Sequence, residues 1–123
     1  MVNISLLGIP HDDNSSFMKG PSEAPPLIRR ELLSDAYSSW SESRIDVGAT
    51  GRLKDHGHIQ FDGASDPWDL IEQRVGQAME SGDPLICLGG DHAITHPIMR
   101  AVRRRHPNRS CWGLFNLKSC PNH

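Results

Sequence analysis

Residues 84–92 read PLICLGGDH, and this stretch decides the fold. The apolar run of residues 84–88 is typical of a buried strand. Gly89 and Gly90 then let the backbone turn sharply off the strand and approach another chain segment closely. His92 follows, so the pattern predicts a histidine at the start of the next helix, beside Asp91.

Helices are predicted on both sides of this strand. Residues 95–105 carry apolar side chains at helical spacing, with Thr95 as the expected cap and Pro97 in the first turn. Upstream, Asp66 and Pro67 open a predicted helix that ends near Ser81 and Gly82. The order helix, strand, helix indicates a βαβ-type organisation.

The N-terminal third repeats this order. Residues 4–9 form an apolar run that predicts a first buried strand, followed by a polar loop over residues 10–26. A helix is expected from Pro25 and Pro26 to about Asp35. Ile45 and Val47 alternate with polar residues, which suggests a short strand. Residues 48–65 show no clear period, so we predict a long loop there. We therefore predict an α/β fold with a mainly parallel sheet and helices on its faces.

The composition excludes several classes of protein. The 123 residues allow at most one domain, and we find neither a transmembrane run nor a signal peptide, so we expect a cytoplasmic protein with no membrane partner. Three cysteines fit a reducing compartment. Seven Lys and Arg stand against fifteen Asp and Glu up to Asp91, a net charge of −8, and the last 32 residues carry +6. Basic residues 103–105 suit a helix C-terminus, so we expect no nucleic-acid partner.

Ligands of parallel α/β sheets bind beyond the carboxyl ends of the strands, which places residues 10–26 and 89–92 at the expected site. A neutral imidazole at His92 could bind a transition metal, and the alternative is a hydrogen-bonded histidine in a tight turn. Asp12, Asp13 and Asn14 could line a substrate entrance or cap a turn. His56 and His58 are expected to be solvated, and no catalytic residue is assigned. The substrate-binding residues are left unknown.

Two segments resemble the ureohydrolases, the family of arginases and agmatinases. Residues 85–95 (LICLGGDHAIT) are similar to the family's first metal-binding segment, and residues 8–16 (GIPHDDNSS) with Gly20-Pro21 and Ile28-Arg29 are similar to its first strand and loop. The resemblance implies a partial three-layer α/β/α arginase-like fold, truncated relative to the family. It also implies two Mn²⁺ ions that share a hydroxide, hydrolysis of a guanidino substrate to urea, His92 as a ligand of one metal, and homo-oligomers.

The resemblance is lost at about Asn108, so we expect a truncated ureohydrolase-like domain over residues 1-107 and a divergent tail over residues 108-123. The family's next segment, Asp-x-His-x-Asp, is not found, and the tail holds no carboxylate. A frameshift, an alternative exon or a gene-model error would produce such a break. We therefore expect an agmatinase-like amidinohydrolase that is inactive as this chain alone. The alternative is a non-catalytic fragment or an interaction module that pairs with full-length subunits.

Overall fold

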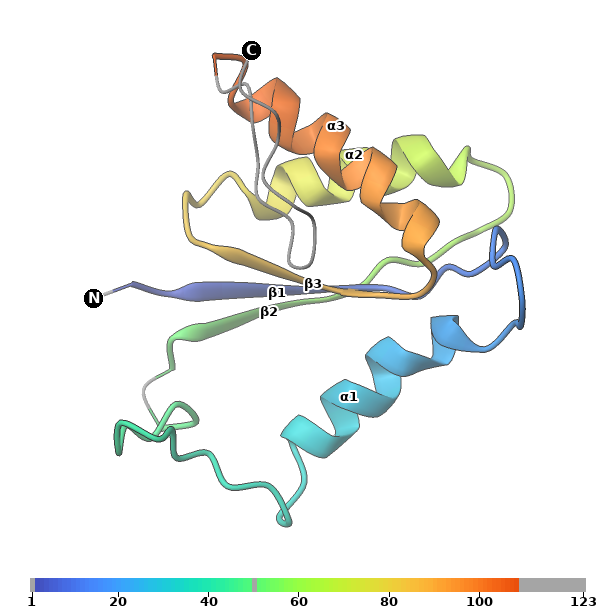
Figure 1. Cartoon of the computed structure of the whole chain (residues 1–123). Helices are drawn as coiled ribbons and strands as arrows, with labels where there is room; N and C mark the ends of the chain where they lie inside the picture. The colour runs from blue at the N-terminus through green and yellow to red at the C-terminus, as the bar shows by residue number, and fades with distance from the viewer. Residues whose placement is uncertain (1, 50, 109–123) are drawn as a thin grey trace.

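The computed structural model of the chain describes residues 2–49 and 51–108. Within these residues, strands and helices alternate along the chain as predicted (Figure 1). The strands are β1 (Ile4–Ile9), β2 (Leu53–His58) and β3 (Leu85–Gly89), and the helices are α1 (Ala24–Leu32), α2 (Pro67–Ala78) and α3 (Thr95–Arg105). Two short 3-10 helices, η1 (Pro21–Glu23) and η2 (His92–Ile94), precede α1 and α3.

The three strands form one parallel sheet in the order β2-β1-β3. Helices α2 and α3 cover one face of the sheet, and α1 lies on the other (Figure 1). This confirms the predicted α/β fold with helices on both faces of a parallel sheet. All strand carboxyl ends meet at one edge, where the loop after β1 and the turn after β3 also lie.

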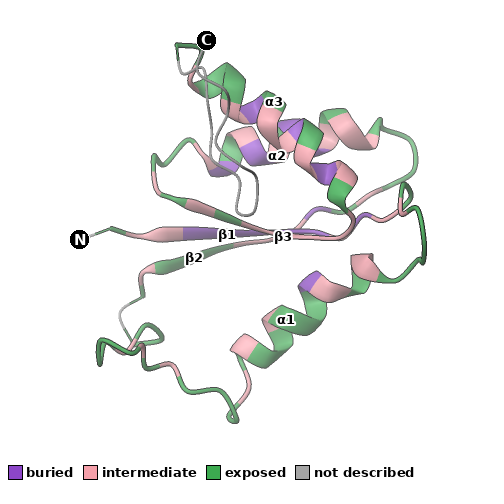
Figure 2. Ribbon diagram, viewed as in Figure 1, coloured by how far each residue is buried: buried purple, intermediate pink, exposed green. Residues whose placement is uncertain are grey.

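The hydrophobic core lies between the sheet and the pair α2 and α3 (Figure 2). Side chains alternate along β1, so Leu7 and Ile9 point into this core and are fully buried. Helix α2 begins as the sequence predicts, since the Asp66 carboxylate accepts the Trp68 N–H at 2.8 Å. The buried members of the core are Leu7, Ile9, Ile59, Ile71, Val75, Ala78, Ile94 and Ala101.

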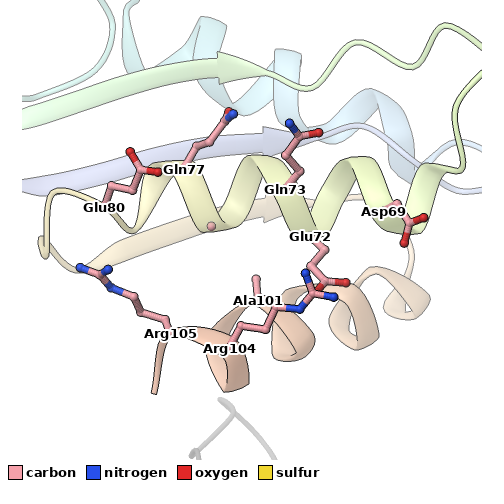
Figure 3. A pocket seen from close by; sticks show the side chains of 9 residues that line it. Asp69, Glu72, Gln73, Gln77, Glu80, Ala101, Arg104 and Arg105 are labelled. Carbon is pink, nitrogen blue, oxygen red and sulfur yellow. The ribbon is translucent and has the colours of Figure 1, made fainter. Parts of the chain in front are cut away.

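Helices α2 and α3 are also joined by a buried carboxylate. Glu72 of α2 lies 3.0 Å from Arg100 Nε and 2.6 Å from Arg104 Nε, both on α3. Figure 3 shows Glu72 and Arg104 pointing toward one another across the groove between the two helices. The residues that line this groove belong to α2, the turn after it and α3.

Two predictions about the middle of the chain are wrong. Strand β2 lies inside the predicted loop of residues 48–65, and Ile45 and Val47 do not form a strand; nearby there is only an isolated bridge between Trp40 and Asp46. The sequence of β2, LKDHGH, lacks the apolar alternation of a half-buried strand. Strand β2 pairs with β1 through its backbone groups. Its side chains therefore give little indication in the sequence that a strand forms here.

Helix α1 ends at Leu32, three residues before the predicted Asp35, and turns replace its last part. Among the described residues, no helix has the length and apolar character needed to cross a membrane.

Candidate functional site

The turn after β3 and the loop after β1 are joined at the carboxyl edge of the sheet. The Asp91 N–H donates to the His11 carbonyl at 3.0 Å. In return, the Asp91 carboxylate accepts the Asn14 N–H at 3.0 Å through Oδ2. A Cβ atom on Gly90 would overlap the His11 carbonyl, so only glycine fits this approach. The predicted close approach of Gly90 to another segment is confirmed.

His92 is the first residue of η2 and is exposed at this edge. The second carboxylate oxygen of Asp91 accepts the Ala93 N–H at 3.0 Å and so caps η2. The predicted cap, Thr95, has no such role, because α3 continues directly from η2 and Asp91 closes the whole helical segment. Asp91 therefore fixes the backbone on both sides of the turn that carries His92.

His11 is a buried residue that the sequence did not single out. Its side chain is 5% exposed, and its ring lies against Phe61 and Trp68 at centroid distances of 5.1 and 5.6 Å. Both ring nitrogens are buried and have no hydrogen-bond partner among the described residues, and Nε2 lies 3.5 Å from the Asp13 carboxylate. In the sequence, His11 stands among polar loop residues, and no local pattern separates it from an exposed one.

Of the two interpretations of Asp12, the structure supports the turn cap. Its carboxylate accepts the N–H groups of Gly20 at 2.7 Å and Ser22 at 3.2 Å, closing the loop onto η1. These two N–H groups, Gly20 first, hold the pKa of Asp12 below its usual range. Asp13 is exposed, 3.8 Å from Lys19 Nζ. The structure brings the Asn14 backbone to Asp91 but leaves its side chain exposed.

The expectation that His56 and His58 are merely solvated is wrong. His56 Nε2 lies 3.1 Å from Ser5 Oγ on one face of the sheet. The His58 ring packs over Gly8 on the other face, within hydrogen-bond distance of Arg29. The signal that could have placed them is Gly57, which permits a bulge between the two histidines.

The described residues do not make up the donor set that two divalent cations need. In residues 2–49 and 51–108, no three His, Cys, Asp or Glu side chains come together to hold a metal ion. Both Asp91 carboxylate oxygens accept backbone N–H groups, which leaves His92 as the donor that faces outward. Residues 109–123, nearly all of the predicted divergent tail, lie outside the described residues.

Comparison with known proteins identifies the family. The model of the arginase family matches residues 2–112 of this chain. Arginase 1, mitochondrial, from Arabidopsis thaliana is 36% identical over 110 residues, which are 82% of this chain and 32% of that protein. The corresponding arginase of Oryza sativa subsp. japonica is 35% identical over 109 residues, covering 81% and 32%. The chain thus spans about a third of the length of these curated relatives.

Solved structures agree on the fold. The arginase from Medicago truncatula superposes with a TM-score of 0.71 at 30% identity, over 86% of this chain and 36% of that one. A structure described as a putative agmatinase from Clostridium difficile gives a TM-score of 0.73 at 20% identity, over 86% and 38%. A formiminoglutamase of Trypanosoma cruzi solved with Mn²⁺ gives 0.69 at 23% identity, over 86% and 36%. With the family model matching most of its residues, the chain belongs to the arginase family.

Proposed function

We propose that this chain derives from a manganese-dependent amidinohydrolase and carries one of its metal-ligand positions, His92. The observation that carries the proposal is the closure of residues 89–92 on the loop after β1, which holds an exposed imidazole at the carboxyl edge of a parallel sheet. That edge is where ligands of such sheets bind. A neutral imidazole is a suitable partner for Mn²⁺ when carboxylates complete the set.

Because the described residues supply His92 but no carboxylates to complete a metal site, we propose that the 123-residue chain alone releases no urea. Bound Mn²⁺ would supply an activated water, but one imidazole cannot neutralise two divalent cations. The chain's own residues shape the turn that carries His92. Asp91 holds the turn, Gly90 admits the His11 backbone, and His92 faces solvent.

Membership in the arginase family leads us to propose a linear guanidino compound as the substrate class. The agmatine-like substrate is a hypothesis from residues 12–16 after β1, where Asp12 accepts two backbone N–H groups through one of its carboxylate oxygens. The Arabidopsis thaliana and Oryza sativa relatives, both above 30% identity, are named arginases. Arginine and agmatine are therefore both included in the test, and the cytoplasmic location stays a prediction.

A urea assay with Mn²⁺ and either arginine or agmatine tests the inactivity. We expect no urea above the protein-free blank. Paramagnetic line broadening by Mn²⁺ tests the ligand separately: amide signals of residues 90–94 should broaden at millimolar metal and recover in His92→Ala. His96→Ala is the matched control, because His96 is an exposed histidine of α3. Urea release that disappears in His92→Ala would overturn the inactivity, and broadening unchanged in His92→Ala would make His92 a turn histidine.

A second candidate is a non-catalytic module that pairs with full-length subunits of the family. It is favoured by the shortage of metal donors in the described part of the chain, together with β3, which in that part pairs with β1 alone. A strand edge with unpaired backbone groups can accept another strand. Co-expression with a tagged full-length arginase would test this: a mixed oligomer that survives size-exclusion chromatography supports the module, and complete separation contradicts it.

A further inference from the structure

A bulge in β2 turns His58 toward the face of the sheet that α1 covers. Leu6 of β1 is opposite Asp55, but Gly8 is opposite His58, so β2 has one more residue than β1 over this stretch. Gly57 supplies the extra residue with a φ of 76°, a conformation that favours glycine. A Cβ on Gly8 would overlap the His58 ring, so Gly8 provides the space in which the ring lies.

Arg29 of α1 reaches across to this ring. Its Nη1 lies 2.7 Å from both ring nitrogens of His58. Its Nη2 contacts the Asp55 carboxylate and donates to the Gly57 carbonyl at 3.1 Å. The Arg29 side chain is 12% exposed. One guanidinium therefore binds three positions of the bulged strand.

This polar cluster ties α1 to β2, and the helix also lies against β1 and β3. All residues of α1 are described, and among them only Pro25 is buried. Leu27 and Ile28, which would be expected to anchor an amphipathic helix, remain 44% and 41% exposed. Because little apolar surface of α1 is buried, we expect the contacts of Arg29 to contribute to holding α1 against the sheet.

The contact of Arg29 with His58 requires a neutral imidazole. A protonated ring has two N–H donors and no acceptor, and it would place a second positive charge against the guanidinium. The charged groups that face the ring in the described residues are Arg29 from α1 and Asp55 from β2, while β1 presents the uncharged Gly8. Burial, and then Arg29, lower the pKa of His58 from its usual 6.5, and Asp55 opposes them.

We propose that His58 is a proton-controlled latch: the neutral ring helps to hold α1 on the sheet through Arg29, and protonation weakens this attachment. The effect reaches the carboxyl edge, because the segment before α1 is tied to it. Asp12 caps η1 directly before α1, and Asn14 donates to Asp91. Release of α1 would therefore loosen the loop that holds the turn of residues 89–92.

Hydrogen exchange of the 123-residue chain between pH 7.5 and 5.5 tests the latch. After correction for intrinsic exchange rates, the opening constant of residues 24–32 should rise as the pH falls below 6.5, by up to tenfold per pH unit for one proton. Residues 67–78 of α2 serve as the internal reference and should stay unchanged. A corrected opening of α1 that does not depend on pH would overturn the proposal.

Two variants separate the latch from general acid sensitivity. His58→Gln keeps an acceptor but cannot titrate, so the pH response of α1 should be lost. His56→Gln is the matched control: His56 lies on the same strand, faces Ser5 instead, and its replacement should preserve the response. A response that persists in His58→Gln contradicts the proposal.

A measurement on the unsubstituted chain keeps the test independent of variant folding. In an NMR titration, the His58 ring signals and the α1 amides should shift with one midpoint below 6.5. Separate midpoints would assign the response of α1 to another group and overturn the latch.

Discussion

The two faces of the sheet are held to their helices in different ways. On the face of α2 and α3, apolar side chains such as Leu7, Ile71 and Val75 are fully buried, and the burial runs along both helices (Figure 2). On the other face, α1 keeps large apolar residues exposed and attaches through Arg29 to β2. Apolar burial is non-directional and independent of protonation, whereas the Arg29 cluster depends on geometry and charge. The attachment of α1 to the sheet should therefore respond to pH more than the packing of α2 and α3 does.

The largest expected effect tests the packed face. Ile71→Ala removes most of a fully buried side chain from α2 and should lower the free energy of unfolding by about 2–5 kcal/mol. Leu33→Ala, just after α1, is the control: Leu33 is 79% exposed, so a change within about 0.5 kcal/mol is expected. Urea denaturation followed by circular dichroism measures both. Equal losses of unfolding free energy in the two variants would contradict the proposed difference between the packed face and the α1 face.

Two glycines give the next effect, with opposite signs. Gly8→Ala would push its Cβ into the His58 ring, which Arg29 pins, and should cost about 1–3 kcal/mol of stability. Gly76→Ala lies in α2 with open space around its Cβ position and should add up to about 1 kcal/mol through helix propensity. Thermal unfolding of both variants measures the signs. Stabilisation by Gly8→Ala would show that the ring does not need that space.

The last effect concerns alkaline pH and the packed face. Burial raises the pKa of the Cys87 thiol from its usual 9.0 to about 11. Between these values the unfolded chain loses the proton and the folded chain keeps it, so stability should fall by about 1.4 kcal/mol per pH unit as the pH rises. The difference in slope between the unsubstituted chain and Cys87→Ala, measured by urea denaturation, isolates this group. Identical slopes would mean that the partly buried Cys87 thiol has the same pKa in the folded and the unfolded chain.

The sequence alone determined those parts that depend on local patterns. The apolar runs of β1 and β3 and the helical stripes of α2 and α3 are each long enough to be recognised, and Asp66 marks the start of α2. The turn of residues 89–92 could also be placed, because two glycines after a buried strand allow a sharp turn with a close approach. These residues also carried the resemblance to the family.

Tertiary structure decided the rest. Strand β2 exists because β1 offers its backbone groups to a polar segment, and that pairing leaves no apolar pattern in the residues of β2. The burial of His11 depends on Phe61 and Trp68, which lie far along the chain from it. The contact of Arg29 with His58 depends on a bulge at Gly57 and on empty space at Gly8. Each of these features joins segments far apart in the chain, and their contacts are set by packing in three dimensions, which local periodicity does not record.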